Sequence, residues 1–484
     1  MPAPADDSTH ERLLELVALA RPVAERFAQA GHSLFAVGGA VRDALLGAPA
    51  RDEQEIDFTT DARPEEIMLL LAPLCSTLWE QGREFGTIGG IVRETGLKAE
   101  VTTFRSESYV VHSRKPAVQW GDSLSEDLSR RDFTINAIAL DVIALAEERP
   151  DTRVLIDEHG GIPDLFAHRL RTPAEPGGLF RDDPLRMLRA ARFAARFALE
   201  IDPAIEEAAR AEAPALAKVS VERVRGELDL LLTTPRPSIG LDFLVRTGVA
   251  DQFLPELPAL QLEQDPLHQH KDVLRHTMAV VDKASPDLTL RLAALLHDIG
   301  KPRTRAISDE GVTFRFHEVV GAKMARARLV ALKYPQAIID DVSDLVELHL
   351  RFHTYKLGWT DRAVRRYVRD AGPLLERLNE LTRCDATTRN ARKVATFARR
   401  MDELERRIVE LEAQEDLRRL RPALDGNQVM AELGLAPGPV IGRALAHLME
   451  IRLDEGEISV EDARTRLRAW WSEQPESAGG PASA

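Results

Sequence analysis

SLFAVGGAVRDALLG (33–47) and EIDFTT (55–60) decide the fold of the N-terminal part of this chain. The SLFAV segment is a short apolar strand that runs directly into Gly38 and Gly39, and the residues after them are typical of a helix. Glycines let a backbone approach a phosphate closely, and the first N–H groups of a helix point toward such an anion. This order predicts a phosphate site, with a purely structural turn as the alternative. Arg42 follows one helical turn later and is expected to reach a triphosphate.

The EIDFTT strand adds acidic side chains next to this turn. Glu55 and Asp57 are two residues apart and therefore point to the same face, while Ile56 and Phe58 supply the buried face. Two carboxylates held together are unfavourable unless a cation lies between them. Glu100 lies near the start of another strand pattern and offers a third carboxylate. The layout predicts two-metal phosphoryl transfer, with an exposed acidic strand edge as the simpler alternative.

The composition predicts several helix-rich domains in a reducing compartment. A chain of 484 residues is expected to form about two to four domains, and its low aromatic content of 5% favours helices built on Leu, Ala and Val. The net charge of −14 excludes a uniformly basic nucleic-acid binder but leaves room for a local basic patch. The two cysteines form no disulfide or zinc pattern, and we find no signal peptide or membrane-spanning run, so we expect a cytoplasmic protein.

Changes of pattern along the chain predict an α+β protein that is mostly helical. Strands with a few helices continue to about residue 170, and the pattern is almost wholly helical afterwards. We expect an N-terminal helix over 1–30, a head with a small mixed sheet over 31–170, a helical neck over 171–255, a histidine-rich domain over 256–400, a helical tail over 401–474 and a disordered end over 475–484.

Four segments in this order carry a resemblance to a known family: FAVGGAVRDALLG, EIDFTTDARP, RRDFTINAIA (130–139) and RDDPLRMLRAARFAARF (181–197). They resemble the bacterial tRNA nucleotidyltransferase (CCA-adding) and poly(A) polymerase family, which has a polymerase-β-type head. SVERVRGEL (220–228) and DGNQVMAELGLAPGPVIGRAL (425–445) look like its neck motif and tail turn, so the resemblance covers nearly the whole chain.

The resemblance implies a role for each matching residue in the head. Glu55, Asp57 and Glu100 would hold two Mg²⁺ ions while the tRNA 3′-hydroxyl attacks the α-phosphate of CTP or ATP. Arg131 and Asp132 would contact the ribose or phosphates of that nucleotide. The implied nucleotide-binding set is Gly38, Gly39, Arg42, Arg131, Asp132, Asp183, Arg186, Arg189 and Arg192.

The resemblance also implies that Asp183 and Arg186 read the base edge in place of a template. A carboxylate accepts from the exocyclic amine that cytosine and adenine share, and a guanidinium donates to a ring atom. Their spacing of three predicts a shared helical face, with an acidic helix cap as the simpler alternative. Arg189, Arg192 and Arg196 continue the pattern, either as a solvated face or as a wall toward the triphosphate or tRNA.

The chain departs from the family pattern at two positions. Glu55 stands where the family has Asp, and its longer stem changes metal geometry that tolerates little misplacement. We therefore expect retained but weaker activity. Asp182 stands where the family commonly has Glu.

The histidine-rich domain contains a second metal pattern. His297 and Asp298 are adjacent on an apolar helix, where an ionised Asp is costly without a metal or a partner. This segment resembles the HD phosphohydrolase superfamily, and the alternative is a degenerate HD domain kept as a scaffold. The resemblance implies a divalent ion (Mg²⁺, Mn²⁺ or one like Ni²⁺) and activity on phosphate esters such as 2′,3′-cyclic phosphates or damaged RNA ends. The implied ligands are His276, His297, Asp298 and Asp385, with His317 and His349 for a second metal.

The expected function is addition of C, C and A to tRNA 3′ ends, with tRNA, CTP and ATP as partners and no membrane contact. RNARKVATFARR (389–400) is either a phosphate-binding stripe or a solvated helix face. A poly(A) polymerase or a C- or A-adding enzyme is the nearest alternative. An HD hydrolase with a tRNA-binding head is a second alternative, and a non-catalytic RNA-binding protein would leave both metal patterns unexplained. The pattern does not specify an oligomeric state.

Overall fold

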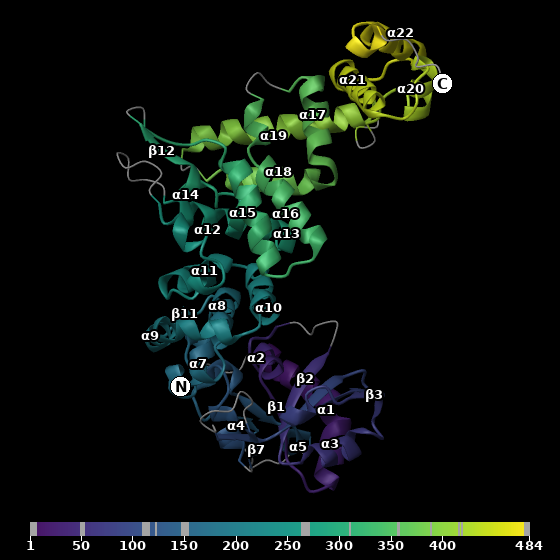
Figure 1. Ribbon diagram of the computed structural model, residues 1–484. Helices are drawn as coiled ribbons and strands as arrows, with labels where there is room; N and C mark the ends of the chain where they lie inside the picture. Colours follow the sequence, from purple (N-terminus) through teal and green to yellow (C-terminus); the bar gives the residue numbers. More distant parts are fainter. Residues whose placement is uncertain are drawn as a thin grey trace. The chain divides into compact units, whose positions relative to one another are not determined.

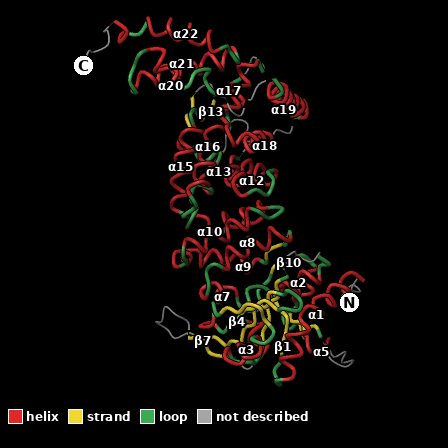
Figure 2. Tube along the Cα trace, turned by 90° about the vertical axis from the view of Figure 1, so that its right-hand side faces the viewer, coloured by secondary structure: helices red, strands yellow, loops and turns green. Residues whose placement is uncertain are grey.

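The computed structural model forms two compact units, Met1–Phe253 and Leu254–Ala484 (Figure 1). The first contains the main sheet of the chain and the second is nearly all helix (Figure 2). The predicted class, α+β and mostly helical, is confirmed. The structure describes residues 7–48, 54–108, 117–121, 123–146, 154–262, 272–308, 311–355, 359–387, 390–414, 417 and 420–478.

A seven-stranded mixed sheet forms the head, in the order β3-β4-β5-β2-β1-β8-β9. Its only parallel pair is β2 with β5, and this register sets Asp57 opposite Glu100 and Glu55 opposite Lys98. The predicted apolar and acidic strands are therefore confirmed as β1 and β2. The strands are β1 (Leu34–Val37), β2 (Glu55–Thr60), β3 (Cys75–Trp79), β4 (Thr87–Val92), β5 (Lys98–Thr103), β8 (Ala139–Asp141) and β9 (Leu155–Ile156), with the separate pair β6 (Arg105–Ser108) and β7 (Ala117–Trp120).

The N-terminal helix is part of the head. Helix α1 packs against α2, α5 and β1, because its apolar residues Val23 and Phe27 are fully buried. Val37 of β1 joins a buried cluster with Leu128 and Ala139 on the sheet. The helices of the head are α1 (Asp7–Gln29), α2 (Gly39–Leu45), α3 (Pro64–Leu71), α4 (Leu124–Ser129), α5 (Val142–Ala146) and α6 (Gly161–Phe166), with the 3₁₀ turns η1 (Arg83–Phe85) and η2 (Thr134–Asn136).

Helix α8 is the centre of the neck and packs against α10 and α11. It begins at Arg186, and Asp183 is an extended residue after α7 with φ −138° and ψ 98°. The expectation that Asp183 and Arg186 share one helical face is therefore wrong, because Pro184 disfavours helical backbone at the residue before it. The neck contains α7 (Pro176–Asp182), α8 (Arg186–Phe197), α9 (Pro203–Glu212), α10 (Val221–Leu232), α11 (Pro237–Arg246), η3 (Ala213–Lys218), η4 (Ala250–Gln252) and the strand pair β10 (Arg169–Leu170) and β11 (Glu200–Ile201).

Close packing of α11 on α8 depends on Gly240. A Cβ at this position would lie 2.4 Å from the carbonyl oxygen of Ala191, a backbone atom that has little room to move. We expect Gly240→Ala to lower the free energy of unfolding by about 1–3 kcal/mol through overpacking. Gly226→Ala in α10 is the control, because nothing lies within 4 Å and helix propensity favours alanine. Urea unfolding of both variants tests this, and equal stability of the two would contradict it.

The second unit contains a helical domain and a small helical tail. Helix α19 runs from Ala391 to Glu412, so the expected boundary at residue 400 falls inside one helix. The sequence prediction set the boundary where the charge changes from basic to mixed. The two halves of α19 nevertheless form one helix, because they share an apolar face that buries Met401, Leu404 and Ile408. The elements before the tail are α12 (Val273–Lys283), α13 (Leu288–Leu296), α14 (Lys301–Thr304), β12 (Arg305–Ser308), β13 (Gly311–Phe314), α15 (His317–Ala331), α16 (Gln336–Leu348), α17 (Asp361–Ala371), α18 (Leu375–Asp385) and α19, with η5 (Pro258–Leu260), η6 (Arg351–Thr354) and η7 (Gly372–Leu374).

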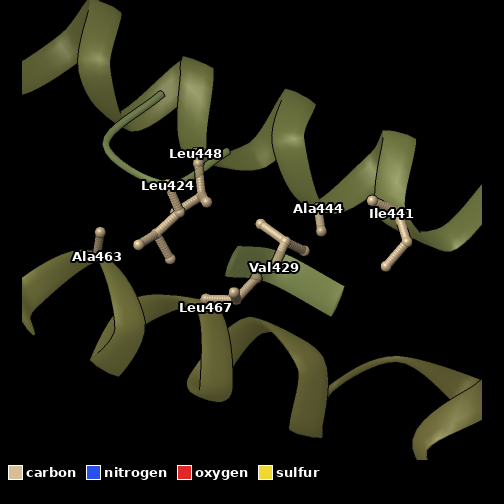
Figure 3. Close-up of a cluster of buried hydrophobic side chains, with 7 residues drawn as sticks. All are labelled: Leu424, Val429, Ile441, Ala444, Leu448, Ala463 and Leu467. Atoms are coloured by element: carbon tan, nitrogen blue, oxygen red, sulfur yellow. The ribbon is translucent and has the colours of Figure 1, made fainter. Parts of the chain in front are cut away.

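The tail has its own hydrophobic core between α20 (Gly426–Leu433), α21 (Pro439–Glu455) and α22 (Val460–Ser472). Figure 3 shows Val429, Leu448 and Leu467 meeting in this core. Residues Pro475–Ala478 form the 3₁₀ turn η9, and the rest of the expected disordered end lies outside the described residues. Within the part of the chain that the structure describes, no helix has the length and apolar character needed to span a bilayer.

Two candidate catalytic centres

The head carboxylates lie on the parallel strand pair β2 and β5. Lys98 joins them, because its Nζ is 2.5 Å from Oε1 of Glu55 and 3.9 Å from Oε1 of Glu100. Asp57 retains contact with solvent, yet desolvation by the surrounding protein raises its pKa; Glu100 and Glu55 add to the increase, and Arg131 opposes it. The carboxylates of Asp57, Glu100 and Glu55 repel one another on adjacent strands, and a divalent cation bound between them would relieve this repulsion.

The glycine turn adjoins Asp57. Gly38 has φ 72° and ψ −130°, a backbone conformation that other residues rarely adopt. A Cβ there would lie 3.6 Å from Arg131 Nη1 and 3.8 Å from Asp57 Oδ2. The turn, the acidic strand and Arg131 therefore converge on one place, as the layout of the sequence predicts.

Most of the candidate nucleotide-binding residues are held in ion pairs. Asp132 is buried and accepts from Arg189 at 2.5 Å, while Arg192 donates to Glu227 at 2.7 Å. Burial favours the neutral form of Asp132, but Arg189 and a hydrogen bond from Asn136 outweigh it and lower its pKa. Three of the four α8 arginines, Arg189, Arg192 and Arg196, thus pair with acidic side chains of the same unit rather than forming a freely solvated face.

Arg42 is only 2% exposed, although its Nη2 lies beside the glycine turn, 3.6 Å from the position of an added Cβ on Gly39. Its guanidinium donates to Asp43 and to Asn136 and lies over the rings of Phe193 and Phe197. Burial lowers its pKa. Through these contacts Arg42 helps to pack α2 against α8 of the neck.

The proposed base-reading pair lies at the junction of α7 and α8, where the Arg186 N–H donates to the carbonyl oxygen of Asp183 at 3.0 Å but the two side chains have different partners. Asp183 Oδ2 accepts from Arg223 at 3.0 Å, and Arg186 donates to the carbonyl oxygens of Leu179 and Arg130. Both side chains keep a partly exposed edge. A base edge would therefore compete with Arg223 for Asp183.

Sequence reasoning missed two residues of this centre. Asp127 is fully buried and accepts from Arg131 at 3.1 Å and from Arg130 at 2.7 Å. Although burial favours its neutral form, Arg131 and Arg130 lower its pKa. The spacing of four between Asp127 in α4 and Arg131 just after that helix was a usable signal. Lys98 gave no such signal, because it meets Glu55 only through the strand register.

The contact between Lys98 and Glu55 predicts the effect of the unusual glutamate. An aspartate at position 55 is too short to hold the Lys98 ammonium in the same way and leaves its carboxylate for a metal ion. We expect Glu55→Asp to lower the half-saturating Mg²⁺ concentration for nucleotide incorporation by roughly threefold to tenfold, the range of about one ordinary hydrogen bond or exposed ion pair. Lys98→Gln should shift it in the same direction. Unchanged Mg²⁺ dependence in both variants would contradict this prediction.

The second centre lies where α12, α13, α15, α16 and α18 meet. Two sets of three groups bring their ligand atoms within 4.8 Å of one another, and both include the buried Asp298. Asp385 Oδ1 joins the first set, 2.9 Å from His276 Nε2 and 3.7 Å from His297 Nε2. The two sets are His276, His297 and Asp298, and then Asp298, His317 and His349.

The histidines present Nε2 toward one another. Nδ1 of His297, His317 and His349 each bonds a backbone carbonyl three residues earlier, at 2.8, 2.8 and 2.6 Å. This second contact sets the tautomer that leaves Nε2 for a metal. His317 Nε2 is buried and lies 3.4 Å from Asp298 Oδ1 without a well-aligned hydrogen bond to any described residue, which fits a metal-ligating nitrogen.

The electrostatics of the second centre favour charged aspartates and a neutral histidine. Burial and the neighbouring His297 lower the pKa of His349 to about 3. Burial lowers the pKa of His297, but Asp298 raises it overall, and His297 in turn helps to hold the pKa of Asp298 well below its usual range. Lys301, missed by sequence reasoning, donates to Asp298 Oδ2 at 2.6 Å. One carboxylate shared by two histidine pairs suits a pair of divalent ions.

Three protein-family models match successive parts of the chain. A Poly A polymerase head domain matches residues 34–171, and a probable RNA and SrmB-binding site of polymerase A matches residues 198–260. An HD domain matches residues 273–411, so it extends through most of α19.

Similar proteins cover most of the chain. The A-adding tRNA nucleotidyltransferase of Deinococcus radiodurans is 37% identical over 372 residues, which are 73% of this chain and 81% of the relative. The CC-adding tRNA nucleotidyltransferase of Thermus thermophilus is 32% identical over 469 residues, 92% of this chain and 95% of the relative. The crystal structure of the Bacillus stearothermophilus CCA-adding enzyme in complex with CTP has a TM-score of 0.64 at 25% identity, covering 94% of this chain and 96% of that one. The resemblance inferred from the sequence is confirmed, and the chain belongs to the tRNA nucleotidyltransferase and poly(A) polymerase family, with an HD domain.

Proposed function

We propose that this chain adds C, C and A to the 3′ end of tRNA from CTP and ATP, with release of pyrophosphate. One observation carries the proposal: the β2–β5 register sets Asp57 beside Glu100, next to the Gly38 turn and Arg131. Two relatives named as tRNA nucleotidyltransferases match 73% and 92% of the chain.

In this proposal Asp57, Glu100 and Glu55 hold divalent ions, with Mg²⁺ as the expected metal. Such ions supply an activated 3′-hydroxyl and neutralise the triphosphate. Arg131, oriented by its ion pair with Asp127, lies where it can donate to the phosphates. Asp183 and Arg186 bind the base edge after Arg223 releases Asp183. The α8 ion pairs act indirectly, by fixing Asp132 and the neck around this site.

The test uses purified protein and tRNA transcripts that end at the discriminator base, at C or at CC. Labelled CTP and ATP are supplied separately and together with Mg²⁺. Two C additions followed by one A support the proposal. Addition of A to the CC transcript alone, or of C alone, identifies a partial enzyme like the relatives from Deinococcus radiodurans and Thermus thermophilus. Long A tails identify a poly(A) polymerase, and no incorporation on any transcript overturns the whole assignment.

A second activity is favoured by the paired clusters that share Asp298. We propose that the HD domain hydrolyses phosphate esters of nucleotides, including 2′,3′-cyclic phosphates. Water adds to the phosphorus, one P–O bond to the ribose breaks, and the freed ribose oxygen takes the proton. Its ligand set fits transition metals better than Mg²⁺ because four imidazoles contribute. Hydrolysis of 2′,3′-cyclic AMP with Mn²⁺, Ni²⁺ or Mg²⁺ tests it, and no hydrolysis with any of these metals would leave the HD domain as a scaffold.

A further inference from the structure

A cationic pocket lies at the start of α19. Its volume is about 340 Å³. We call it the α19 pocket, and it is lined by Asn390, Arg392, Lys393, Thr396, Phe397 and Arg400. Phe397 is its aromatic residue and is half-buried, whereas Arg392 and Lys393 are exposed.

The positive charges of the α19 pocket are not neutralised within the described residues. Arg392 and Lys393 have no carboxylate partner there, and Arg400 donates to the carbonyl oxygen of Tyr355. Later in the same helix, Arg406 and Arg407 both pair with Glu410. A cluster of unpaired cations in a chain with a net charge of −14 is a local anion site.

The α19 pocket lies near the second centre, and His353 interacts with a residue of each. Asn390 follows the ligand Asp385 by five residues, and His353 follows the ligand His349 by four. The ring of His353 lies 6.0 Å from that of Phe397. Burial lowers the pKa of His353, with Asp385 acting to raise it and Arg400 to lower it, so this histidine lies within the field of both the centre and the pocket.

We propose that the α19 pocket binds the RNA strand that leads to a phosphate ester at the HD centre. This inference rests on the phosphohydrolase activity proposed above. Arg392, Lys393 and Arg400 contact backbone phosphates upstream of the terminal one, and Phe397 stacks on a base. A mononucleotide has no upstream phosphates for these cations to contact. The ligand class is therefore an oligoribonucleotide with a 3′-terminal phosphate or 2′,3′-cyclic phosphate, in preference to a free nucleotide.

The experiment compares two substrates on the full-length, Mn²⁺-loaded protein. One is a tetraribonucleotide that ends in a 2′,3′-cyclic phosphate, and the other is 2′,3′-cyclic AMP. We expect the double variant Arg392→Gln/Lys393→Gln to raise KM for the tetranucleotide about tenfold with unchanged kcat, and to change KM for cyclic AMP by less than about twofold. Arg406→Gln is the matched control, because this arginine lies on the same helix and is paired with Glu410.

Binding gives a second readout that is independent of catalysis. Fluorescence anisotropy with a labelled tetranucleotide ending in a 3′-phosphate should show weaker binding by the double variant. The slope of log Kd against log salt should fall by about 0.7 for each lost phosphate contact. Equal binding by the wild type and the double variant would overturn the proposal that the α19 pocket binds RNA. Loss of hydrolysis of both substrates in the wild type, with a binding difference retained, would instead overturn the phosphohydrolase activity.

Discussion

Asp57→Asn is expected to reduce incorporation of CTP and ATP into tRNA by at least about 1,000-fold, the upper range for removing one charge-stabilising group. Asp57 is the carboxylate nearest the Gly38 turn, where its Oδ2 lies 3.8 Å from the position of an added Cβ. Asparagine keeps the shape and removes the charge that a divalent cation needs. Single-turnover incorporation at saturating Mg²⁺ measures the effect, and Glu94→Gln, at an exposed site between β4 and β5, is the control.

The same substitution has a predicted effect on stability. The pKa of Asp57 is raised in the fold by desolvation and by Glu100, so its ionised form destabilises the metal-free protein. A raised folded-state pKa means that this cost appears as pH rises through the titration range of the carboxyl group. We expect Asp57→Asn to raise the metal-free Tm at neutral pH and to abolish the increase in Tm that Mg²⁺ gives the wild type. A lower Tm with retained Mg²⁺ stabilisation would contradict the assignment of Asp57 as a metal ligand.

Asp298→Asn is expected to remove bound metal from the HD domain, with a loss of metal affinity of at least about 100-fold. Removing a residue that only supports a metal ligand already costs about 10–100-fold in affinity, and Asp298 is itself a ligand in this assignment. Asp298 belongs to both sets of ligand atoms, so both metal positions lose a charged donor. His317→Gln removes a ligand from one set only and should retain a single ion. Metal content after dialysis, measured by atomic emission, distinguishes zero, one and two ions per chain.

The head provides the internal control for the HD variants. We expect Asp298→Asn to keep nucleotide incorporation within about twofold of the wild type, because its contacts lie within the HD domain. Hydrolysis of 2′,3′-cyclic AMP should disappear in parallel. A loss of incorporation as large as that of Asp57→Asn would mean that the HD centre supports the transfer reaction, against the separation of the two activities. Full metal content in Asp298→Asn would remove the two-ion assignment.

Local patterns predicted the elements that surround both centres. The apolar run before Gly38, the alternation of EIDFTT and the adjacent pair His297-Asp298 each depend on chemistry within a few residues, and each lies in the expected element or at its end. The predictions failed where a local pattern was extended too far. Pro184 separates Asp183 from the helix of Arg186, and the change of charge near residue 400 falls inside α19.

The partners of the charged side chains, in contrast, are set by the tertiary structure. Arg42 looks like a phosphate ligand in the sequence but is buried between Asn136 and the ring of Phe197. The arginines at 189 and 192 meet Asp132 and Glu227 from distant segments. A guanidinium near a glycine turn serves either role, and the side chains that distant segments place around it decide between them.

By itself, the sequence determined the fold class and the residue types of both centres, because strand alternation, glycine turns and metal-ligand chemistry act through short spacings. The family followed from the resemblance of its motifs, in their order along the chain. The tertiary structure alone decided that Lys98 neutralises Glu55 and that Asp298 is shared by two histidine pairs. These contacts depend on strand register and helix packing between segments that lie up to about a hundred residues apart, and electrostatic partners are selected by distance in space.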